Sequence, residues 1–223
     1  MTASTASGRA AGASTGPRRE RKSDRTRRRI LSAAKHLFDR RGYRDTTVDD
    51  ITSRAEIAHG TFYLHFRGKS EVLRELSTVA LAEFDSIATR GFQTRAEVAG
   101  LIRETLEVYQ RNRLMMRLLR EASATDAHFR EHYDEVFVGV LVDHLRENIE
   151  RTNAALGAAE AVDARAAARA LVGMVESFAY GVFVGGEPFT IDQAVDVLST
   201  FCVRAIGIPP ATQIAGRQMR PGD

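Results

Sequence analysis

Apolar positions recur with the period of an α-helix through most of this chain, and no stretch alternates apolar and polar residues as a strand would. The first periodic segment is expected from Ser23 or Asp24, either of which could cap it, to about Arg41. Gly42 suits the position just after its end. The core-facing stripe falls at i, i+3, i+4, i+7 and i+8, the width that a buried helix face needs: Ile30, Ala33, Ala34, Leu37 and Phe38.

The stretch from Thr46 to Phe66 predicts two short helices joined by a tight turn. Thr47 is placed as the N-cap of the first, because Asp49 and Asp50 follow it in the first turn, where the helix dipole favours negative charge. The core stripe of this first helix is Val48, Ile51 and Ala55. Glu56-Ile57-Ala58 is too short for anything except a turn, with Ile57 filling the angle. The second helix is expected from about His59 to Phe66, with Phe62 and Phe66 facing inward.

The outward face of this second helix lacks the Glu, Lys and Arg of an ordinary solvent face. A helix that enters a DNA major groove needs a slim leading end near the bases and neutral or positive donors towards the phosphates. The other interpretation is an amphipathic hairpin that simply lacks surface charge. The outward residues are Ala58, His59, Gly60, Thr61, Tyr63, Leu64 and His65.

From Ser70 onward the periodic segments again predict only helices. The first long one is lined by Leu76, Ala80, Phe84 and Ile87, and the next by Val98, Ile102, Leu106 and Tyr109. A short helix follows from Leu114 to Leu119. One helix is then expected from about Ala127 to Arg151, with Tyr133, Phe137, Leu141 and His144 on its inner face.

The last two helices, expected over residues 163–184 and 191–206, are apolar nearly all round. A helix of this kind must be buried on both sides. In a chain of this length, we expect a second copy of the chain to cover one of those sides. The candidate residues for such a homodimer interface are Val182, Val195, Leu198, Phe201 and Cys202.

Charge is spread unevenly along the chain. The net charge is +3, yet residues 1–29 hold nine Arg or Lys against two acidic residues, while the remainder holds 23 against 27. Residues 1–22 are expected to form a disordered arm, since residues 1–17 lack apolar content, and residues 208–223 are expected to form a disordered tail. The basic arm is either a solvated tail or a segment that follows DNA phosphates or enters the minor groove.

Composition narrows the class of protein further. The single cysteine, Cys202, cannot form an intrachain disulfide, which suits a cytoplasmic protein. No membrane span and no secretory signal are expected, because no run of 18 uncharged apolar residues and no apolar N-terminal segment is present. A phosphate-cradling glycine loop and a nucleophile elbow are also missing, so we expect neither a cofactor nor enzymatic activity.

The region from about Arg27 to Leu76 resembles the DNA-binding domain of the TetR family of transcriptional repressors. The residues that carry the resemblance are Ile30, Ala33, Ala34, Leu37, Phe38, Gly42-Tyr43, Thr46-Thr47-Val48, Ile51, Ala55, Ile57, Gly60 to Phe66, Lys69 and Leu73. One departure falls at the turn, which often reads Ala-Gly-Val-Ser in the family and is Ala55-Glu56-Ile57-Ala58 here. The helix that follows therefore loses a Ser cap.

The resemblance implies an all-α protein with a three-helix helix-turn-helix domain at residues 23–69 and a helical effector-binding and dimerisation domain at residues 70–207. It implies a homodimer on palindromic double-stranded DNA and a small, mainly hydrophobic effector that releases a repressor. By position, His59 and Thr61 would reach base edges. Phosphate, sugar and neighbouring contacts would come from Arg27, Arg28, Thr46, Thr47, Ala58, Gly60, Tyr63, Leu64, His65 and Lys69.

An effector pocket enters only through this resemblance, since the same apolar residues would also suit a plain core. The candidate wall residues are Phe84, Ile102, Tyr109, Met116, Phe137, Leu141, Met174 and Phe178, with His144 and Glu176 as polar options.

A second hypothesis, from a different class of protein, rests on His128-Phe129-Arg130-Glu131-His132. This segment spells H-x-x-E-H, in which His128 and His132 share a helix face as two zinc ligands would, with Glu131 as the base. It would make the chain a zinc-dependent hydrolase or a metal sensor. No third ligand can be assigned, the signature lacks its confirming context, and two exposed histidines on an amphipathic helix are the simpler explanation.

Overall fold

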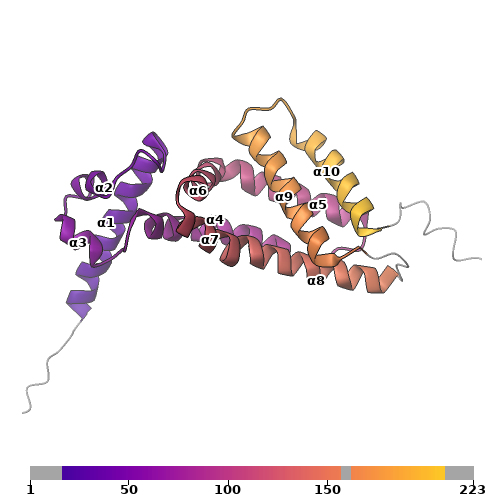
Figure 1. Ribbon diagram of the computed structural model, residues 1–223, viewed down its shortest axis with the longest axis horizontal. Helices are drawn as coiled ribbons and strands as arrows, with labels where there is room; N and C mark the ends of the chain where they lie inside the picture. Colours follow the sequence, from indigo (N-terminus) through magenta and orange to yellow (C-terminus); the bar gives the residue numbers. More distant parts are fainter. Residues whose placement is uncertain (1–16, 157–161, 209–223) are drawn as a thin grey trace, which may run out of the picture.

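The computed structural model describes residues 17–156 and 162–208, with side chains described from Lys22 to Ala155 and from Val162 to Ile208. All the elements assigned in these ranges are helices, which confirms the all-α prediction. Figure 1 shows α1 (Pro17–Arg41), α2 (Val48–Arg54) and α3 (His59–Tyr63) as one cluster at one end of the molecule. The long α4 (Lys69–Ala88) joins this cluster to a larger helical domain.

The larger domain is a bundle around α4, with α5 (Arg95–Arg111), α6 (Arg113–Thr125), α7 (Ala127–Tyr133) and α8 (Gly139–Leu156) following along the chain. Its last two helices are α9 (Ala164–Phe183) and α10 (Ile191–Ile206). The most extensive helix pairs are α10 on α5 and α8 on α9, while α4 packs against both α5 and α8. The bundle thus forms a closed core at a distance from α3.

The start of α1 differs from the prediction. The helix begins at Pro17 rather than at Ser23 or Asp24, with proline at the first helical position, where its fixed φ suits a helix and its missing N–H is not needed. Residues 17–22 therefore belong to the helix, and the predicted boundary of the arm is wrong; residues 1–16 lie outside the described ranges. Gly42 follows the helix at φ +82°, as expected for a residue after a helix end.

The predicted core stripes of the three-helix cluster lie inside. Ile30, Phe38, Ile51 and Phe62 are fully buried and Phe66 is 2% exposed. Ile57 packs against this core from the turn, as predicted. The packing fixes the register of α3, so the residues on its other side are presented to solvent.

The helix expected from Ala127 to Arg151 is interrupted. A π-helical turn, η1 (Asp134–Val138), separates α7 from α8. A π-turn adds one residue to the ring of each backbone hydrogen bond, so side chains before and after it point in directions that a continuous α-helix would not give. Apolar periodicity alone does not reveal such a turn.

The last two helices have the predicted extents, and Gly207 ends α10 in the left-handed conformation at φ +82°. Ile208 is buried, so the predicted tail boundary at 208 is one residue early; residues 209–223 lie outside the described ranges. By length and composition α9 could span a membrane, and only 17% of its most apolar stretch is buried within the protomer. An interface helix of a soluble protein passes the same test.

Candidate nucleic-acid interface and effector cavity

The start of α2 is fixed by a reciprocal cap. Thr47 Oγ1 accepts a hydrogen bond from the Asp50 N–H at 3.1 Å, and the Asp50 carboxylate accepts one from the Thr47 N–H at 3.0 Å. The Thr47 hydroxyl also donates to the Asp50 carboxylate, at 2.6 Å, and this bond together with that from the Thr47 N–H holds the pKa of Asp50 below its ordinary value, with Arg41 contributing. By contrast, Ala58 at the start of α3 provides no side-chain cap, as the departure in the turn implied.

The turn between α2 and α3 contains a strained residue. Glu56 has φ +49°, a left-handed conformation that is unfavourable for residues other than glycine. Arg29 on α1 holds it from outside, with its Nη2 at 3.0 Å from a Glu56 carboxylate oxygen and 3.3 Å from the Glu56 carbonyl oxygen. The turn therefore keeps its shape although the usual glycine is missing.

The outer face of α3 is open to solvent. Ala58, His59 and Gly60 are exposed, and Tyr63 and Leu64 are 51% and 82% exposed. The His59 and Tyr63 rings lie 5.2 Å apart, and His59 Nδ1 lies 2.5 Å from Asp49 Oδ1 on α2. Thr61 and His65 are half-buried beside them. An exposed leucine beside an exposed tyrosine is unfavourable in water unless a partner covers them.

Thr46 does not belong to this surface. Its side chain is fully buried, and its hydroxyl donates to the Gly42 carbonyl oxygen at 2.8 Å. The prediction that Thr46 contacts DNA through its side chain is therefore wrong. It instead closes the loop between α1 and α2.

Two other predicted DNA contacts are engaged inside the domain. Lys69 Nζ donates to the carbonyl oxygens of Tyr43, Arg44 and Thr46 at 2.8, 3.2 and 2.8 Å, and lies 4.4 Å from the centre of the Tyr43 ring. Its burial lowers the pKa of its ammonium group. These carbonyl groups explain why a lysine begins α4, so a phosphate is not needed to explain it; a phosphate contact of Lys69 stays a prediction.

Arg27 is held in a similar way. Its guanidinium forms an ion pair with Glu75, donates to the His65 carbonyl oxygen at 3.0 Å and lies 4.3 Å from the centre of the Phe66 ring. It thus fastens α1 to α4 and to the end of the α3 segment. Arg28, in contrast, is exposed, and its Nε donates only a weak hydrogen bond to the Asp24 carbonyl oxygen.

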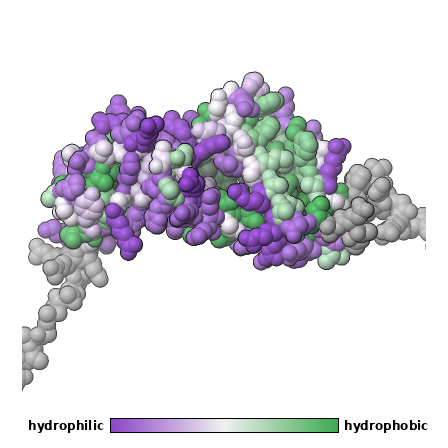
Figure 2. All heavy atoms as spheres, in the orientation of Figure 1, coloured by the Kyte–Doolittle hydropathy of each residue, from purple (hydrophilic) through white to green (hydrophobic). Residues whose placement is uncertain are grey.

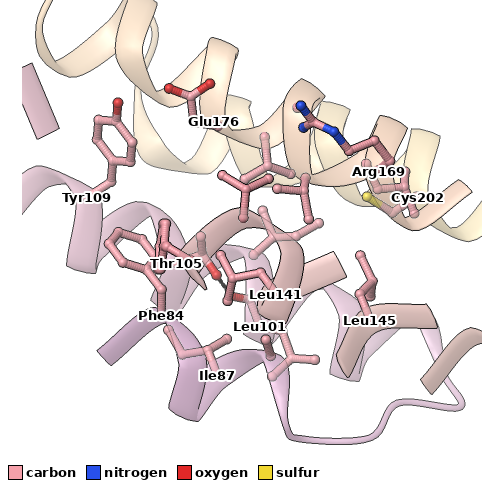
Figure 3. A pocket seen from close by; sticks show the side chains of 18 of the residues that line it. Phe84, Ile87, Leu101, Thr105, Tyr109, Leu141, Leu145, Arg169, Glu176 and Cys202 are labelled. Atoms are coloured by element: carbon pink, nitrogen blue, oxygen red, sulfur yellow. Dashed lines mark hydrogen bonds between the residues drawn. The ribbon is translucent and has the colours of Figure 1, made fainter. Parts of the chain in front are cut away.

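A cavity of about 380 Å³ lies inside the larger domain, between α4, α5, α6, α7, α8, α9 and α10. Its wall is mainly apolar. Figure 3 shows Phe84, Leu101 and Leu141 around its centre, with Tyr109 and Glu176 near one end and Arg169 and Cys202 near the other. Volumes of this size are typical of sites for small molecules.

Six of the predicted pocket residues line this cavity, and so does Glu176; their contact with a ligand stays a prediction. The six are Phe84, Ile102, Tyr109, Met116, Phe137 and Leu141. Three others were predicted wrongly as wall residues. His144 Nδ1 lies 3.1 Å from Asp85 Oδ1 without the alignment of a hydrogen bond, the Phe178 ring contacts Phe189, and Met174 is only packed against the core nearby.

Ser123 is one of the polar wall residues that were not predicted, because nothing in its sequence context distinguishes it from an ordinary surface residue. Ser123 Oγ is buried and has no hydrogen-bond partner among the described residues. Burial and the Glu176 carboxylate raise the pKa of the phenols of Tyr109 and Tyr133, and burial raises the pKa of Cys202 to about 11. Cys202 is thus a core thiol with little thiolate character.

A joint of polar and aromatic contacts connects the two domains. The Glu121 carboxylate on α6 accepts hydrogen bonds from the N–H groups of Tyr43 and Arg44 at 3.2 and 2.7 Å. The Tyr43 hydroxyl donates to Asp126 at 3.2 Å, and Asp126 also caps α7. The loop after α1 is therefore fixed to the junction of α6 and α7.

Aromatic rings continue from this joint to the cavity. Neighbouring ring centres lie 5.2–6.3 Å apart along the series, distances typical of aromatic pairs. The series begins in the core of the three-helix cluster and ends on α9: Phe38, Tyr43, Phe129, Tyr133, Phe137, Phe84, Tyr109 and Phe183.

The zinc hypothesis gains no support. In the ranges 17–156 and 162–208, no group of three or more His, Cys, Asp or Glu side chains is arranged to hold a metal ion. His128 and Glu131 are exposed on α7, and His132 borders a groove against α4. The helix face that they share therefore has two histidines without a third ligand.

A three-helix domain with an exposed, uncharged α3, joined to a helical domain with an internal cavity, defines a helix-turn-helix DNA-binding protein. Residues 30–76 match the sequence model described as bacterial regulatory proteins, tetR family. Residues 30–76 therefore form a DNA-binding domain of the tetR type, and the match supports a TetR-family transcriptional regulator.

Relatives support the same assignment. The chain is 26% identical over 189 residues to the HTH-type transcriptional regulator YvdT of Bacillus subtilis, covering 80% of this chain and 94% of that protein. It is 43% identical over 51 residues to SrpR of Pseudomonas putida, covering 23% of this chain and 24% of that protein.

Solved structures show the same fold. A TetR-family regulator from Syntrophomonas wolfei matches with a TM-score of 0.67 at 20% identity, covering 84% of this chain and 98% of that one. FadR from Bacillus subtilis, solved in complex with stearoyl-CoA, matches with a TM-score of 0.62 at 16% identity, covering 80% and 98%.

Proposed function

We propose that the protein is a homodimeric repressor that binds a palindromic operator in the cytoplasm and is released by a small, mainly apolar effector. The observation that carries this proposal is the internal cavity, because its wall shares Tyr133 and Phe137 with the aromatic series that reaches Tyr43 in the DNA-binding domain. A ligand that moves these rings changes the contacts that hold Tyr43 and the loop after α1 in place. Effector binding and DNA binding are then linked by the difference in ligand affinity between two states.

On DNA, the two α3 helices of the dimer enter successive major grooves about 34 Å apart. His59 and Thr61 reach base edges, and Leu64 contacts a thymine methyl group or a sugar. Thr47, Tyr63 and His65 contact phosphates. The exposure of Tyr63 and Leu64 supports this arrangement, since DNA would cover both.

The effector is expected to bind chiefly through buried hydrocarbon or aromatic surface. Each Å² of apolar surface removed from water contributes about 25 cal/mol, and the cavity wall offers mainly such surface. FadR of Bacillus subtilis, which has the same fold, is solved in complex with stearoyl-CoA, a ligand that joins a long apolar acyl chain to a polar, charged CoA group. Polar groups such as Glu176 and Ser123 would orient the ligand.

The dimer is expected to form through the outer faces of α9 and α10. Val197 and Phe201 on α10 are 43% and 57% exposed, and the most apolar stretch of α9 is mostly uncovered. Figure 2 shows an apolar surface over these two helices. Close approach of a second copy is helped by small residues on the exposed side of α9, which include Ala166, Ala170 and Ser177. We expect a second copy of this chain to cover this face, because an exposed apolar face of this kind is unfavourable in a monomer.

Three of the predicted interface residues do not lie on the outer face of α10. Val195, Leu198 and Cys202 are 8%, 1% and 5% exposed, because this side of α10 packs within the protomer, chiefly against α5. The prediction that they face a partner is wrong. Phe201 is exposed and Val182 half-buried, so both stay predicted interface residues.

The repressor mechanism is tested by a thermal-shift screen followed by operator binding. A ligand present at 100 times its Kd stabilises the folded protein by about 2.7 kcal/mol. We expect the stabilising compounds to be mainly apolar and to lower operator affinity. The proposal fails if apolar ligands stabilise the protein and leave operator affinity unchanged, or if only strongly polar compounds stabilise it.

The dimer is tested by light scattering on Phe201→Asp and Val197→Asp. Both variants keep the protomer core intact and place a charge where the partner would bury it, so we expect mainly monomer. Val136→Asp is the matched control, because Val136 is a 56% exposed valine on η1, away from α9 and α10. Dimers of equal stability in all three variants would rule out this interface.

A further inference from the structure

A groove outside the recognition face remains unexplained. It lies between α1 and the end of α2, and Arg25, Arg28, Arg29 and His36 line it from α1. Arg54 and Glu56 line it from α2 and the following turn. In Figure 1 these elements belong to the three-helix cluster, at the opposite end of the molecule from α10.

The charge in this groove is not balanced. Its one carboxylate, Glu56, is paired with Arg29. Within the part of the chain with described side chains, Arg25, Arg28 and Arg54 form no ion pair with a carboxylate. Several arginines that face one space repel each other at low ionic strength, so the groove favours an anion.

The pKa of His36 responds to the same excess of positive charge. Burial lowers its pKa, and the neighbouring Arg54 and Arg40 lower it further, while Asp39 acts in the opposite direction. Arg54 acts on the imidazole from α2, and Arg40 and Asp39 act from its own helix. The other charged groups of the groove are Arg25, Arg28, Arg29 and Glu56. An anion in the groove would reverse this shift.

The groove is also placed beside the start of α3. Glu56, which forms its edge, stands directly before Ile57 and Ala58, and Ala58 is the N-cap of α3. The same helix α1 continues N-terminally through Lys22 into the basic segment at residues 17–22. DNA strands carry phosphates at regular spacing. DNA that accepts α3 in its major groove therefore brings a run of phosphates towards the N-terminal part of α1.

We propose that this groove binds the sugar–phosphate backbone of the operator DNA that flanks each half-site. This contact rests on the proposed operator binding and extends it beyond α3. Arg25, Arg28 and Arg54 approach the backbone from two sides and supply charge-assisted hydrogen bonds to phosphate oxygens. Because arginines in this position contact no base edge, the groove adds affinity and salt dependence and leaves the choice of sequence to α3.

The test uses a duplex that the wild-type protein selects from a random-sequence pool, in a long form and in a form trimmed to the two half-sites. Fluorescence anisotropy measures the affinity at several KCl concentrations. The variants are Arg25→Ala and Arg54→Gln. The matched control is Arg40→Ala, which removes an exposed arginine of α1 that does not line the groove.

On the long duplex, each variant is expected to lower the salt slope by about 0.9 per phosphate contact, or about 1.8 for a dimer. The trimmed duplex and the Arg40→Ala control are expected to show no such change, and the preference between operator and random DNA is expected to stay the same. Thermal unfolding checks that each variant is folded; if Arg54→Gln is not, Arg25→Ala decides, since Arg25 is an exposed residue on α1.

A second readout is the pH dependence of affinity. A phosphate in the groove raises the pKa of His36 back towards its ordinary value, so binding takes up a proton and affinity rises as the pH falls through about 6.5. His36→Gln is expected to lose this part of the pH dependence on the long duplex.

The proposal is overturned if the salt slope of both variants equals that of the wild type, if Arg40→Ala has the same effect, or if trimming the flanks changes nothing. Binding of free inorganic phosphate or nucleotides in place of flanking DNA, measured by calorimetry, would also overturn it. Failure of the wild-type protein to select any duplex would instead refute the proposed operator binding, so the two failures are distinguishable.

Discussion

Replacing Glu56 by glycine tests the physical account of the turn between α2 and α3. Glu56 adopts φ +49°, and its carboxylate is paired with Arg29. Glycine adopts this conformation without steric penalty, whereas alanine retains the penalty and loses the ion pair. Glu56→Ala is therefore the matched control for Glu56→Gly.

The expected difference in the free energy of unfolding follows from two contributions, because a third, the ion pair, is lost in both variants. The left-handed conformation costs a non-glycine residue about 1–2 kcal/mol. Glycine gives back about 0.4–1 kcal/mol, because it gains entropy in the unfolded chain. The exposed ion pair with Arg29 contributes about 0–1 kcal/mol, and both variants lose it equally. Taking the middle of each range, about 1.5 minus about 0.7, we expect Glu56→Gly to be more stable than Glu56→Ala by about 0.8 kcal/mol.

Urea unfolding followed by circular dichroism measures this difference, and the corresponding shift in melting temperature is roughly 1–4 °C for a chain of this size. Glu56→Ala is expected to lie below the wild type by the contribution of the ion pair. If Glu56→Ala is as stable as Glu56→Gly, the turn holds no backbone strain and the account is wrong.

The remaining predictions concern the same domain. Tyr63→Ala should weaken operator binding several-fold without changing thermal stability, since the side chain is half-exposed; wild-type affinity in an anisotropy assay would contradict the placement of α3. Gly60→Ala should not destabilise the protein, because a Cβ there meets no atom within 4 Å, and a loss of operator affinity would show that DNA approaches the backbone at this point. Lys69→Met should lower the free energy of unfolding by about 1.5–3 kcal/mol, because three carbonyl oxygens lose a charged donor. Unchanged stability with weaker DNA binding would instead assign Lys69 to a phosphate.

Much of the fold follows from local signals in the sequence. The limits of α10 could be predicted from its apolar positions, and the structure adds the caps that fix them: Thr190 caps its start and Gly207 ends it in a left-handed conformation. The inward positions of Ile51 and Phe62 follow from helical spacing alone. In these places local propensity and tertiary packing favour the same structure.

Other features depend on what meets in space. The carbonyl groups that accept from Lys69 lie in a loop more than twenty residues earlier, so the lysine could be interpreted only as an exposed or phosphate-binding group. On α10, Leu198 and Phe201 are equally apolar, and only the position of α5 decides that the first is buried and the second exposed. The cavity is a property of imperfect packing, which no periodicity encodes.

In the proposed operator complex, the joint at Glu121 would separate two kinds of information. The residues of α3 would read the sequence of a half-site. The distance between two half-sites would follow from the orientation in which α6 and α7 hold the loop around Tyr43. A chimera that joins this DNA-binding domain to the effector domain of a relative should therefore recognise the same half-sites at a different separation. Substitutions at this joint, which does not contact DNA, could therefore change the preferred separation of half-sites during evolution without changing the half-site sequence.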